Sequence, residues 1–293
     1  MDLPPGVRLE PGFGGLTKVV VATDLATAEV YLHGAHVTHY QPAGQGPVLF
    51  LSRQSLFAAG KAIRGGVPIC FPWFGPLENR PKAPAHGFAR TSLWALAAAT
   101  RDGGGVVTLR FELSRGEDPA SDWPHAFRAE YAVTVGPELT MALTIHHVGG
   151  EPFLYEAALH TYLSVGDVRQ ASVTGLENTP YLDKAAGREE PGVDAPVRFT
   201  GETDRVYQET TAACTADDPA GHRTIRVEKS GSASTVVWNP WAAKAKAKAM
   251  SDFGDDEWPG MLCIETANVR GSAVTLGPGA SHTMTAVVRV GAR

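Results

Sequence analysis

With 293 residues, 43% of them hydrophobic, the chain is long enough to bury a large core. Its formal net charge of −5 at pH 7 argues against a nucleic-acid-binding protein, which needs a basic face, but leaves room for a small anion held by a few arginines. No apolar run reaches the ~18 residues that suggest a membrane span, and the segment MDLPPGVRLEPG lacks the basic and apolar regions of a signal peptide. We therefore expect neither a nucleic acid nor a membrane among the partners.

Most segments alternate apolar and polar residues with the period of a β-strand. In chain order, the predicted strands lie in 17–42 (three strands), 105–114, 127–136, 138–148, 156–165, 236–240, 260–269, 272–279 and 281–290. The 32 glycines and 21 prolines are spread between and around these segments. Short strands with such punctuation predict an all-β sandwich or barrel. Neither an internal repeat nor a long linker divides the sequence, so we expect a single domain covering 1–293.

The loop GKAIRGGVPICFPWFGP (60–76) carries the first candidate ligand-binding residue. Arg64 precedes two glycines, whose backbone can take unusual angles, and three prolines stiffen the rest of the loop. A guanidinium on such a rigid, aromatic-lined loop is suited to grip an anion through its fork of N–H donors. The equally good alternative is a structural arginine that caps loop carbonyls.

A second loop, APAHGFARTSLW (83–94), supplies His86 and Arg90. A His-x-x-x-Arg spacing is a weak signal by itself. Together with Arg64 and the aromatic Phe71 and Trp73, it indicates a pocket for a negatively charged sugar, whose apolar face an aromatic ring can cover. The alternative is that the tryptophans of these loops belong to the core.

Two titratable residues interrupt apolar strands. His160 lies within EAALHTYLSV (156–165), and Glu265 lies within GMLCIETANV (260–269). One such residue is most often a satisfied structural group, because charged side chains are rarely buried without a partner or a task. Two of complementary type, if they face one cleft, form an acid–base pair in which the imidazole gives a proton and the carboxylate accepts one.

Two further features bear on location and on the surface. Cys70, Cys214 and Cys263 are odd in number and never form C-x-x-C, so we expect three reduced thiols, no metal site and a cytoplasmic protein. The segment WAAKAKAKAMSDF (241–253) is rich in alanine and lysine and has high helix propensity. Acidic residues flank its lysines, so we expect a solvated surface helix rather than a strand or a nucleic-acid patch. We assign this tract no function.

The blocks IRGGVPICFPWFGP, AHGFARTSLW, LHTYLSVGD and CIETANV together resemble the signature blocks of the glucose-6-phosphate 1-epimerase family. These hexose-6-phosphate mutarotases are a branch of the aldose 1-epimerase superfamily, and the resemblance runs in order from about residue 30 to residue 290. It implies a galactose-mutarotase-like β-sandwich (supersandwich) with a few short helices. It also implies that His160 is the general acid and Glu265 the general base.

The resemblance further implies that Arg64 and Arg90 lie near the sugar phosphate. Asp204, in TGETDRVY (200–207), matches an aspartate that holds sugar hydroxyls, and His86 matches a second sugar-binding histidine. The sequence departs from the family pattern at Ala85, where members often carry a glutamine, so one hydrogen bond to the sugar is lost or made by water.

The implied reaction interconverts the α and β anomers of a hexose 6-phosphate, most readily glucose 6-phosphate, by ring opening and closure. It needs no metal, nucleotide or redox cofactor and no obligate protein partner, and Glu265 is expected to stay ionised beside a protonated His160. The alternatives are an aldose 1-epimerase for neutral hexoses and a non-catalytic carbohydrate-binding sandwich. A glycoside hydrolase is a third reading, but it needs paired carboxylates. The preferred hexose and the oligomeric state stay open.

Overall fold

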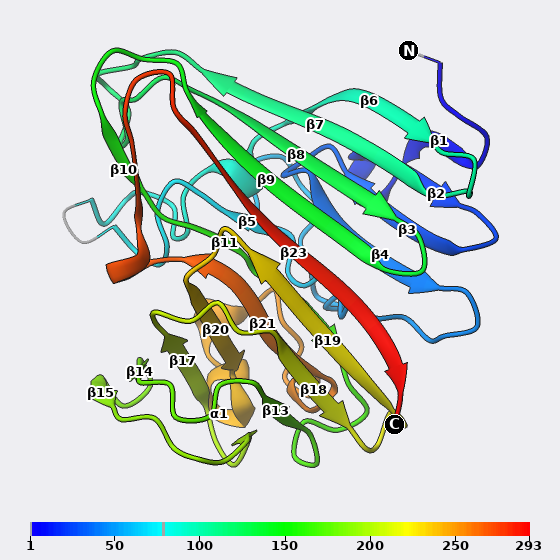
Figure 1. The fold of residues 1–293 in the computed structure, drawn as a ribbon, viewed down its shortest axis with the longest axis vertical. Coiled ribbons are helices and arrows are strands. Elements are labelled where there is room, and N and C mark those ends of the chain that lie inside the picture. Colours follow the sequence, from blue (N-terminus) through cyan, green and yellow to red (C-terminus); the bar gives the residue numbers. More distant parts are fainter. Residues whose placement is uncertain (1, 78–79) are drawn as a thin grey trace.

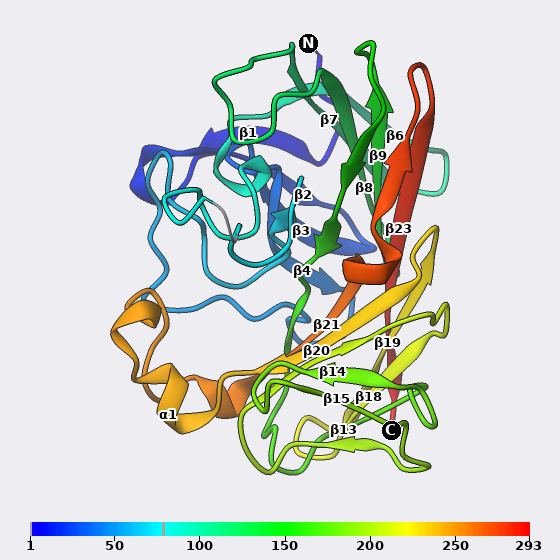
Figure 2. The same ribbon diagram turned by 90° about the vertical axis from the view of Figure 1, so that its left-hand side faces the viewer.

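The structure is a computed structural model that describes residues 2–77 and 80–293, and its strands form two layers (Figures 1 and 2). One layer is a nine-stranded antiparallel sheet. Its strands in spatial order are β16 (Val197–Arg198), β13 (Ser172–Thr174), β18 (Cys214–Asp218), β19 (Arg223–Ser230), β23 (Ser281–Ala292), β9 (Leu139–His147), β8 (Phe127–Val135), β7 (Val107–Arg115) and β6 (Ala95–Arg101). Figure 2 shows β7–β9 and β23 along one side of the molecule, with the other sheets stacked against them.

The second layer contains a four-stranded and an eight-stranded sheet. The four-stranded sheet runs β1 (Val7–Pro11), β2 (Thr17–Ala22), β3 (Ala26–Tyr31) and β4 (His36–Pro42). The eight-stranded sheet runs β15 (Arg188–Glu190), β14 (Tyr181–Asp183), β17 (Thr203–Tyr207), β20 (Ser234–Asn239), β21 (Met261–Asn268), β11 (Ala157–Leu159) and β5 (Ile69–Cys70), with β12 (Tyr162–Ser164) also paired to β21. A small ribbon of β10 (Phe153–Tyr155) and β22 (Val274–Leu276) completes the β-structure. The prediction of an all-β sandwich is confirmed.

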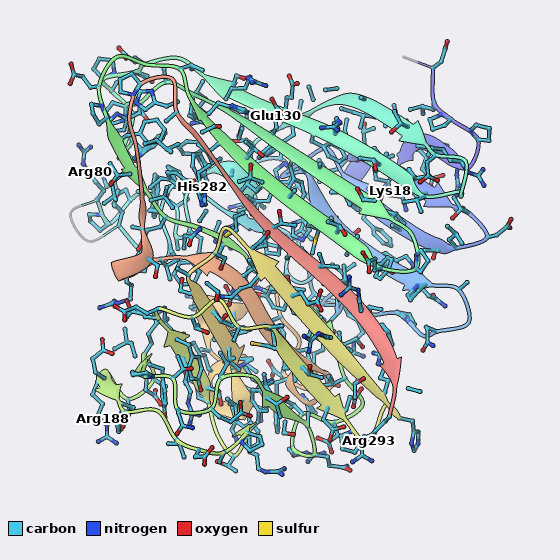
Figure 3. The ribbon with its side chains drawn as sticks, viewed as in Figure 1. Lys18, Arg80, Glu130, Arg188, His282 and Arg293 are labelled. Carbon is cyan, nitrogen blue, oxygen red and sulfur yellow. The ribbon has the colours of Figure 1, made fainter. Side chains whose placement is uncertain are left out.

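Side-chain alternation places the main core between the two layers. Along β8 every second residue, from Phe127 to Val135, is buried, and the residues between them are partly exposed. The opposite face of this sheet meets solvent, as the position of Glu130 in Figure 3 illustrates. A hydrogen bond of 3.0 Å from the Tyr40 hydroxyl to the backbone oxygen of Gly136 ties the layers together.

Strand β21 differs because it is buried on both faces. Leu262 and Ile264 pack into the main core, whereas Cys263 lies with a second apolar cluster on the other side of the sheet. Since successive side chains point to opposite faces, Glu265 shares the face of Cys263. The sandwich core and the face that carries Glu265 are therefore separated by the thickness of one sheet.

The expected surface helix at 241–253 is only partly present. Helix α1 covers Trp241–Ala245, and a 3₁₀ turn follows at Lys248–Met250; the other 3₁₀ turns are Phe13–Gly15, Ala89–Thr91, Trp258–Gly260 and Arg270–Ser272. Both Ala245 and Met250 are buried in the second cluster. On a continuous helix of 3.6 residues per turn they would lie about 140° apart, so burying both requires the break.

Among the helices of residues 2–77 and 80–293, none combines the length and the apolar character that a membrane span requires.

Candidate active site

His160 and Glu265 face each other because of strand register. Leu159 pairs with Thr266 and Tyr162 pairs with Cys263, so the same register sets His160 opposite Glu265. The predicted strand at 156–165 is interrupted here: the backbone N–H of His160 donates to Pro68 instead of to β21. Directly opposed residues of an antiparallel pair have Cβ atoms about 4.5–5.5 Å apart, so the two side chains meet.

The pair is in direct contact in a dry environment. His160 Nε2 lies 3.3 Å from Glu265 Oε1, and the two side chains are 10% and 1% exposed. Tyr162 stacks on the imidazole with ring centroids 4.7 Å apart and planes 10° apart, and Trp238 meets its edge at 5.9 Å. His160 Nδ1 and Glu265 Oε2 are buried without a hydrogen-bond partner in the described part of the chain. An unsatisfied buried polar atom is costly, so these two atoms point to a polar ligand.

Burial controls the protonation of both groups. It raises the pKa of Glu265 well above its usual value, and the nearby Asp204 raises it further. Burial also lowers the pKa of His160 well below its usual value, and neighbouring positive charge adds to this. The pair therefore favours a neutral imidazole beside a protonated carboxyl group. This differs from the expectation that Glu265 stays ionised, because no side chain with a full positive charge contacts its carboxylate within the described residues.

His86 lies next to the pair in a strained turn. Its φ is 64°, and its ring lies 5.9 Å from that of His160 and 4.7 Å from that of Phe74. Its Nδ1 accepts a hydrogen bond of 3.3 Å from the backbone N–H of Gly75, and burial lowers its pKa well below the usual value. The ring is therefore neutral and carries its proton on Nε2, which makes Nε2 a hydrogen-bond donor.

Arg64 is anchored by protein partners. Its Nη2 donates to Asp252 Oδ1 at 3.0 Å and its Nη1 donates to the Tyr162 hydroxyl at 3.2 Å. The alternative of a structural arginine thus has support at this position, although Nε stays buried without a partner among the described residues. The charge of Arg64 acts on His160 and helps to lower the pKa of that imidazole.

The positive charge of Arg90 is less neutralised than that of Arg64. Its Nη2 donates to the backbone oxygen of Ala85 at 2.8 Å, and no acidic side chain pairs with it in the described part of the chain. Its charge acts on both His160 and Glu265, lowering the pKa of each. The contribution of Ala85 to the site is therefore its backbone oxygen, which holds Arg90.

Asp204 is positioned by two lysines. Asp204 Oδ2 lies 3.7 Å from Lys184 Nζ and 3.8 Å from Lys244 Nζ, and Lys244 also contacts Glu202 at 2.6 Å. Lys244 belongs to the alanine–lysine tract, to which the sequence assigned no function. Burial raises the pKa of Asp204, and the two lysines oppose that rise.

A cavity of about 490 Å³ lies beside these residues. Phe74, Lys184 and Val206 line it. Val206 pairs with Val236 on the next strand, and Val236 pairs with Glu265 on the strand after that. Neighbouring strands lie about 4.8 Å apart, so Val206 and the cavity lie about 10 Å from Glu265. The volume is within the range of small-molecule sites.

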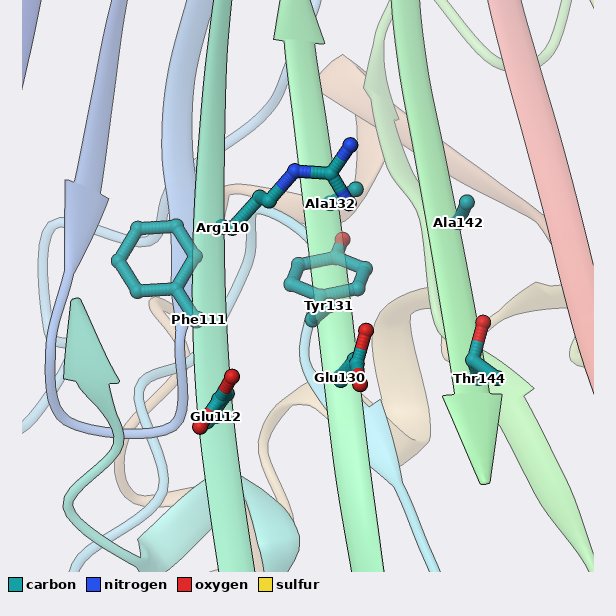
Figure 4. Close-up of a pocket in the computed structure, with 8 residues that line it drawn as sticks. All are labelled: Arg110, Phe111, Glu112, Glu130, Tyr131, Ala132, Ala142 and Thr144. Atoms are coloured by element: carbon teal, nitrogen blue, oxygen red, sulfur yellow. The ribbon is translucent and has the colours of Figure 1, made fainter. Parts of the chain in front are cut away.

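A smaller hollow of about 150 Å³ lies elsewhere, on the solvent-facing side of β7–β9 (Figure 4). It exists because Ala132 and Ala142, neighbours across two strands, are shorter than the surrounding Arg110 and Glu130. It contains none of the predicted site residues.

All six predicted residues thus gather around one region of the eight-stranded sheet. Their roles stay predictions, since only the geometry is observed. Sequence reasoning missed several side chains that shape the site, namely Tyr162, Lys184, Trp238, Lys244 and Asp252. Knowledge of the register between the strands would have identified Tyr162 and Trp238, because both are cross-strand partners of Cys263.

Comparison with known proteins agrees with this architecture. The model of the family described as aldose 1-epimerase matches residues 18–289. A protein named "Putative glucose-6-phosphate 1-epimerase" from Escherichia coli (strain K12) is 39% identical over 253 residues, which is 86% of this chain and 83% of the relative. A protein of the same name from Cenchrus ciliaris is 38% identical over 277 residues, 90% of this chain and 82% of the relative.

A solved structure shares the whole fold. The crystal structure of a "putative mutarotase (YeaD)" from Salmonella typhimurium superimposes with a TM-score of 0.91 at 33% identity, covering 100% of this chain and 96% of the other. The expected likeness to mutarotase folds is therefore confirmed.

Proposed function

The chain belongs to the aldose 1-epimerase family, and from this premise we propose that it interconverts the α and β anomers of hexose 6-phosphates, with glucose 6-phosphate as the preferred substrate. The observation that carries the proposal is the contact of 3.3 Å between His160 Nε2 and Glu265 Oε1. Relatives named for glucose 6-phosphate support the substrate class. Enzymatic epimerisation is the activity of this family.

The reaction requires one proton to leave the O1 hydroxyl and one to reach the ring oxygen. We assign the first transfer to Glu265 and the second to His160. The C1–O5 bond then breaks to give the open-chain aldehyde, rotation about C1–C2 presents its other face, and the reverse transfers close the ring. Both oxygens are bonded to C1, so a base and an acid in contact with each other can reach them together. Each positioned proton transfer contributes about 10²–10⁴-fold.

The pair can reach the required protonation state without exchanging protons with solvent. A neutral imidazole beside a carboxylic acid and an imidazolium beside a carboxylate contain the same number of protons. One proton moving across the 3.3 Å contact converts the first form into the second. A polar sugar that supplies hydrogen bonds to the buried oxygen of Glu265 would favour the ionised form.

The arginines separate a phosphosugar enzyme from one for neutral hexoses. A neutral-sugar epimerase would use the same His160 and Glu265 but has no need for Arg90, a guanidinium without an acidic partner within the described residues. We assign Arg90 as the principal phosphate contact and Arg64 as a second one. His86 and Asp204 then hold sugar hydroxyls, as donor and acceptor.

We further propose that 1–293 act as one domain in the cytoplasm. The main core takes side chains from β1 through β23, so the sheets stabilise one another. Cys70, Cys214 and Cys263 are all free and buried, which suits a reducing compartment.

Two-dimensional NMR exchange spectroscopy on glucose 6-phosphate and on glucose tests the function. We expect the wild-type protein to accelerate anomer exchange of the phosphosugar far more than that of glucose, and Glu265→Gln to lose about 10²–10⁴-fold of the rate. Preference for glucose would support the neutral-sugar alternative. Binding of the phosphosugar without faster exchange would indicate a carbohydrate-binding module and would overturn the proposal.

A further inference from the structure

We propose that His160, Cys263 and Glu265 form a binding site for Zn²⁺. Zinc bound there occupies the catalytic pair and inhibits anomer exchange. The site goes beyond the proposed function, and its binding test does not depend on that function.

The sheet brings the three side chains together. Cys263 and Glu265 are two residues apart on β21 and therefore share a face, and His160 lies opposite Glu265. One ligand atom from each residue lies within 4.8 Å of the other two, and all three residues are buried. The thiol of Cys263 thus sits beside a pair that the catalytic proposal uses without it.

The distances suit a four-coordinate zinc ion. Zinc binds thiolate at about 2.3 Å and imidazole or carboxylate at about 2.0–2.2 Å, so tetrahedral ligand atoms lie roughly 3.3–3.7 Å apart. The His160–Glu265 separation of 3.3 Å already matches, and the thiol must approach by at most about 1.5 Å. Three protein ligands leave a fourth position for water or a sugar hydroxyl.

The ligand set matches the charge of a divalent ion once Cys263 and Glu265 are deprotonated. Zn²⁺ with one thiolate and one carboxylate is formally neutral, which reduces the cost of burying each charge. On binding, the Cys263 thiol releases its proton to solvent, and Glu265 releases one wherever it is protonated. Arg64 and Arg90 oppose a cation here, so affinity has to come from the zinc–sulfur and zinc–nitrogen bonds. Mg²⁺, which prefers six oxygen ligands, is not expected to bind.

Cobalt spectroscopy on the tag-free, full-length protein tests the site. Co²⁺ bound to thiolate gives a sulfur-to-cobalt charge-transfer band, together with visible bands typical of four-coordinate Co²⁺. We expect these bands in the wild-type protein, their loss in Cys263→Ser, and their retention in Cys214→Ser, which changes an equally buried cysteine on β18. Zn²⁺ should displace Co²⁺ from the wild-type protein, and Glu265→Gln should bind Co²⁺ at least about tenfold more weakly.

Bands absent from the wild-type protein, or unchanged in Cys263→Ser, would overturn the site. If Cys263→Ser does not fold, zinc-edge X-ray absorption on the wild-type protein gives the same decision: one sulfur neighbour at about 2.3 Å supports the site, and a shell of nitrogen and oxygen alone refutes it. Loss of anomer exchange in the zinc-loaded protein, reversed by a chelator, is the expected functional consequence.

Discussion

Arg64 and Asp252 form an ion pair with 3.0 Å between Nη2 and Oδ1, at the side of the site where the Tyr162 hydroxyl also meets the guanidinium. The pair neutralises part of the charge that Arg64 could offer to an anion. Arg90 has no such acidic partner within the described residues, so the two predicted phosphate ligands are not equivalent.

We predict that Arg90→Ala raises KM for glucose 6-phosphate by about 10–100-fold, because a charge-assisted hydrogen bond contributes about 1.5–3 kcal/mol. Arg64→Ala should raise KM less, and kcat should change little in both. Steady-state kinetics by NMR exchange provides the measurement, and the slow exchange of unphosphorylated glucose is the internal control. Equal KM values in wild type and Arg90→Ala would remove Arg90 from the phosphate site.

Lys244 is expected to act through Asp204. In Lys244→Gln the pKa of Asp204 should rise, because one of the two lysines that oppose the effect of burial is lost. The carboxylate then loses its negative charge at a higher pH than in wild type, so the increase in KM should grow as the pH falls. Lys184 still opposes the rise in the pKa of Asp204, so we expect a moderate effect on KM of about 2–10-fold.

The control for this prediction is Lys246→Gln, since Lys246 is exposed and forms no ion pair within the described residues. In the Asp204→Asn background, Lys244→Gln should have little further effect. Additive effects of the two substitutions would show that Lys244 acts elsewhere.

Tyr162 has two separable contacts, one through its ring and one through its hydroxyl. Tyr162→Phe keeps the ring stacked on His160 but removes the acceptor for Arg64, so KM should rise about 3–10-fold with little change in kcat. Tyr162→Leu also removes the stacked ring, so kcat should fall as the imidazole loses its orientation. Comparing kcat and KM across the two variants is the measurement. An equal kcat in both would mean that the stacking does not position His160.

Glu257 makes an acid-sensitive contribution to stability. Its carboxylate accepts hydrogen bonds from Ser52 Oγ at 2.7 Å, from the backbone N–H of Arg53 at 2.8 Å and from that of Gly254 at 2.8 Å. Burial alone would raise its pKa, but these bonds outweigh it and the pKa is lowered. A carboxyl group with a lowered pKa in the folded state stabilises the protein above the unfolded pKa, and this contribution is lost as the pH falls through the folded value.

Glu257→Gln should therefore lower the free energy of unfolding by about 1–3 kcal/mol at neutral pH. The difference from wild type should shrink as the pH falls below 4.5, the usual value for this group. Urea unfolding at a series of pH values measures it. The matched substitution Asp256→Asn, at a side chain that is 79% exposed, should change stability by less than about 0.5 kcal/mol. A difference independent of pH would contradict this account.

The sequence was most informative where alternation was strongest. It predicted β2–β4, β7–β9, β20, β21 and β23, and it singled out His160 and Glu265 as polar residues in apolar strands, but it missed the whole run β13–β19. Alternation shows which side chains share a face of one strand, but it does not give the register between strands. For that reason Trp238, which is a cross-strand neighbour of Cys263, could not be assigned to the site beforehand.

Ion pairs between residues far apart in the sequence could not be predicted from it either. Asp252 joins Arg64 across 188 positions of the chain, and composition favoured a continuous helix over 241–253, which includes Asp252. The buried Ala245 and Met250 override that propensity, because tertiary packing outweighs the few tenths of a kcal/mol per residue that separate helix formers. The ionisation of Glu265 also depended on burial, which the sequence does not quantify.

The constant register across the gap between β11 and β12 makes the protein intolerant of insertions there. Sliding β21 by one position would bring Ile264 or Thr266 opposite the imidazole and turn the carboxylate into the apolar interior. One residue inserted between Leu159 and His160 would instead move the imidazole out of line with Glu265. Loops elsewhere can change in length without disturbing this contact, whereas the ladder cannot, because its register sets His160 against Glu265.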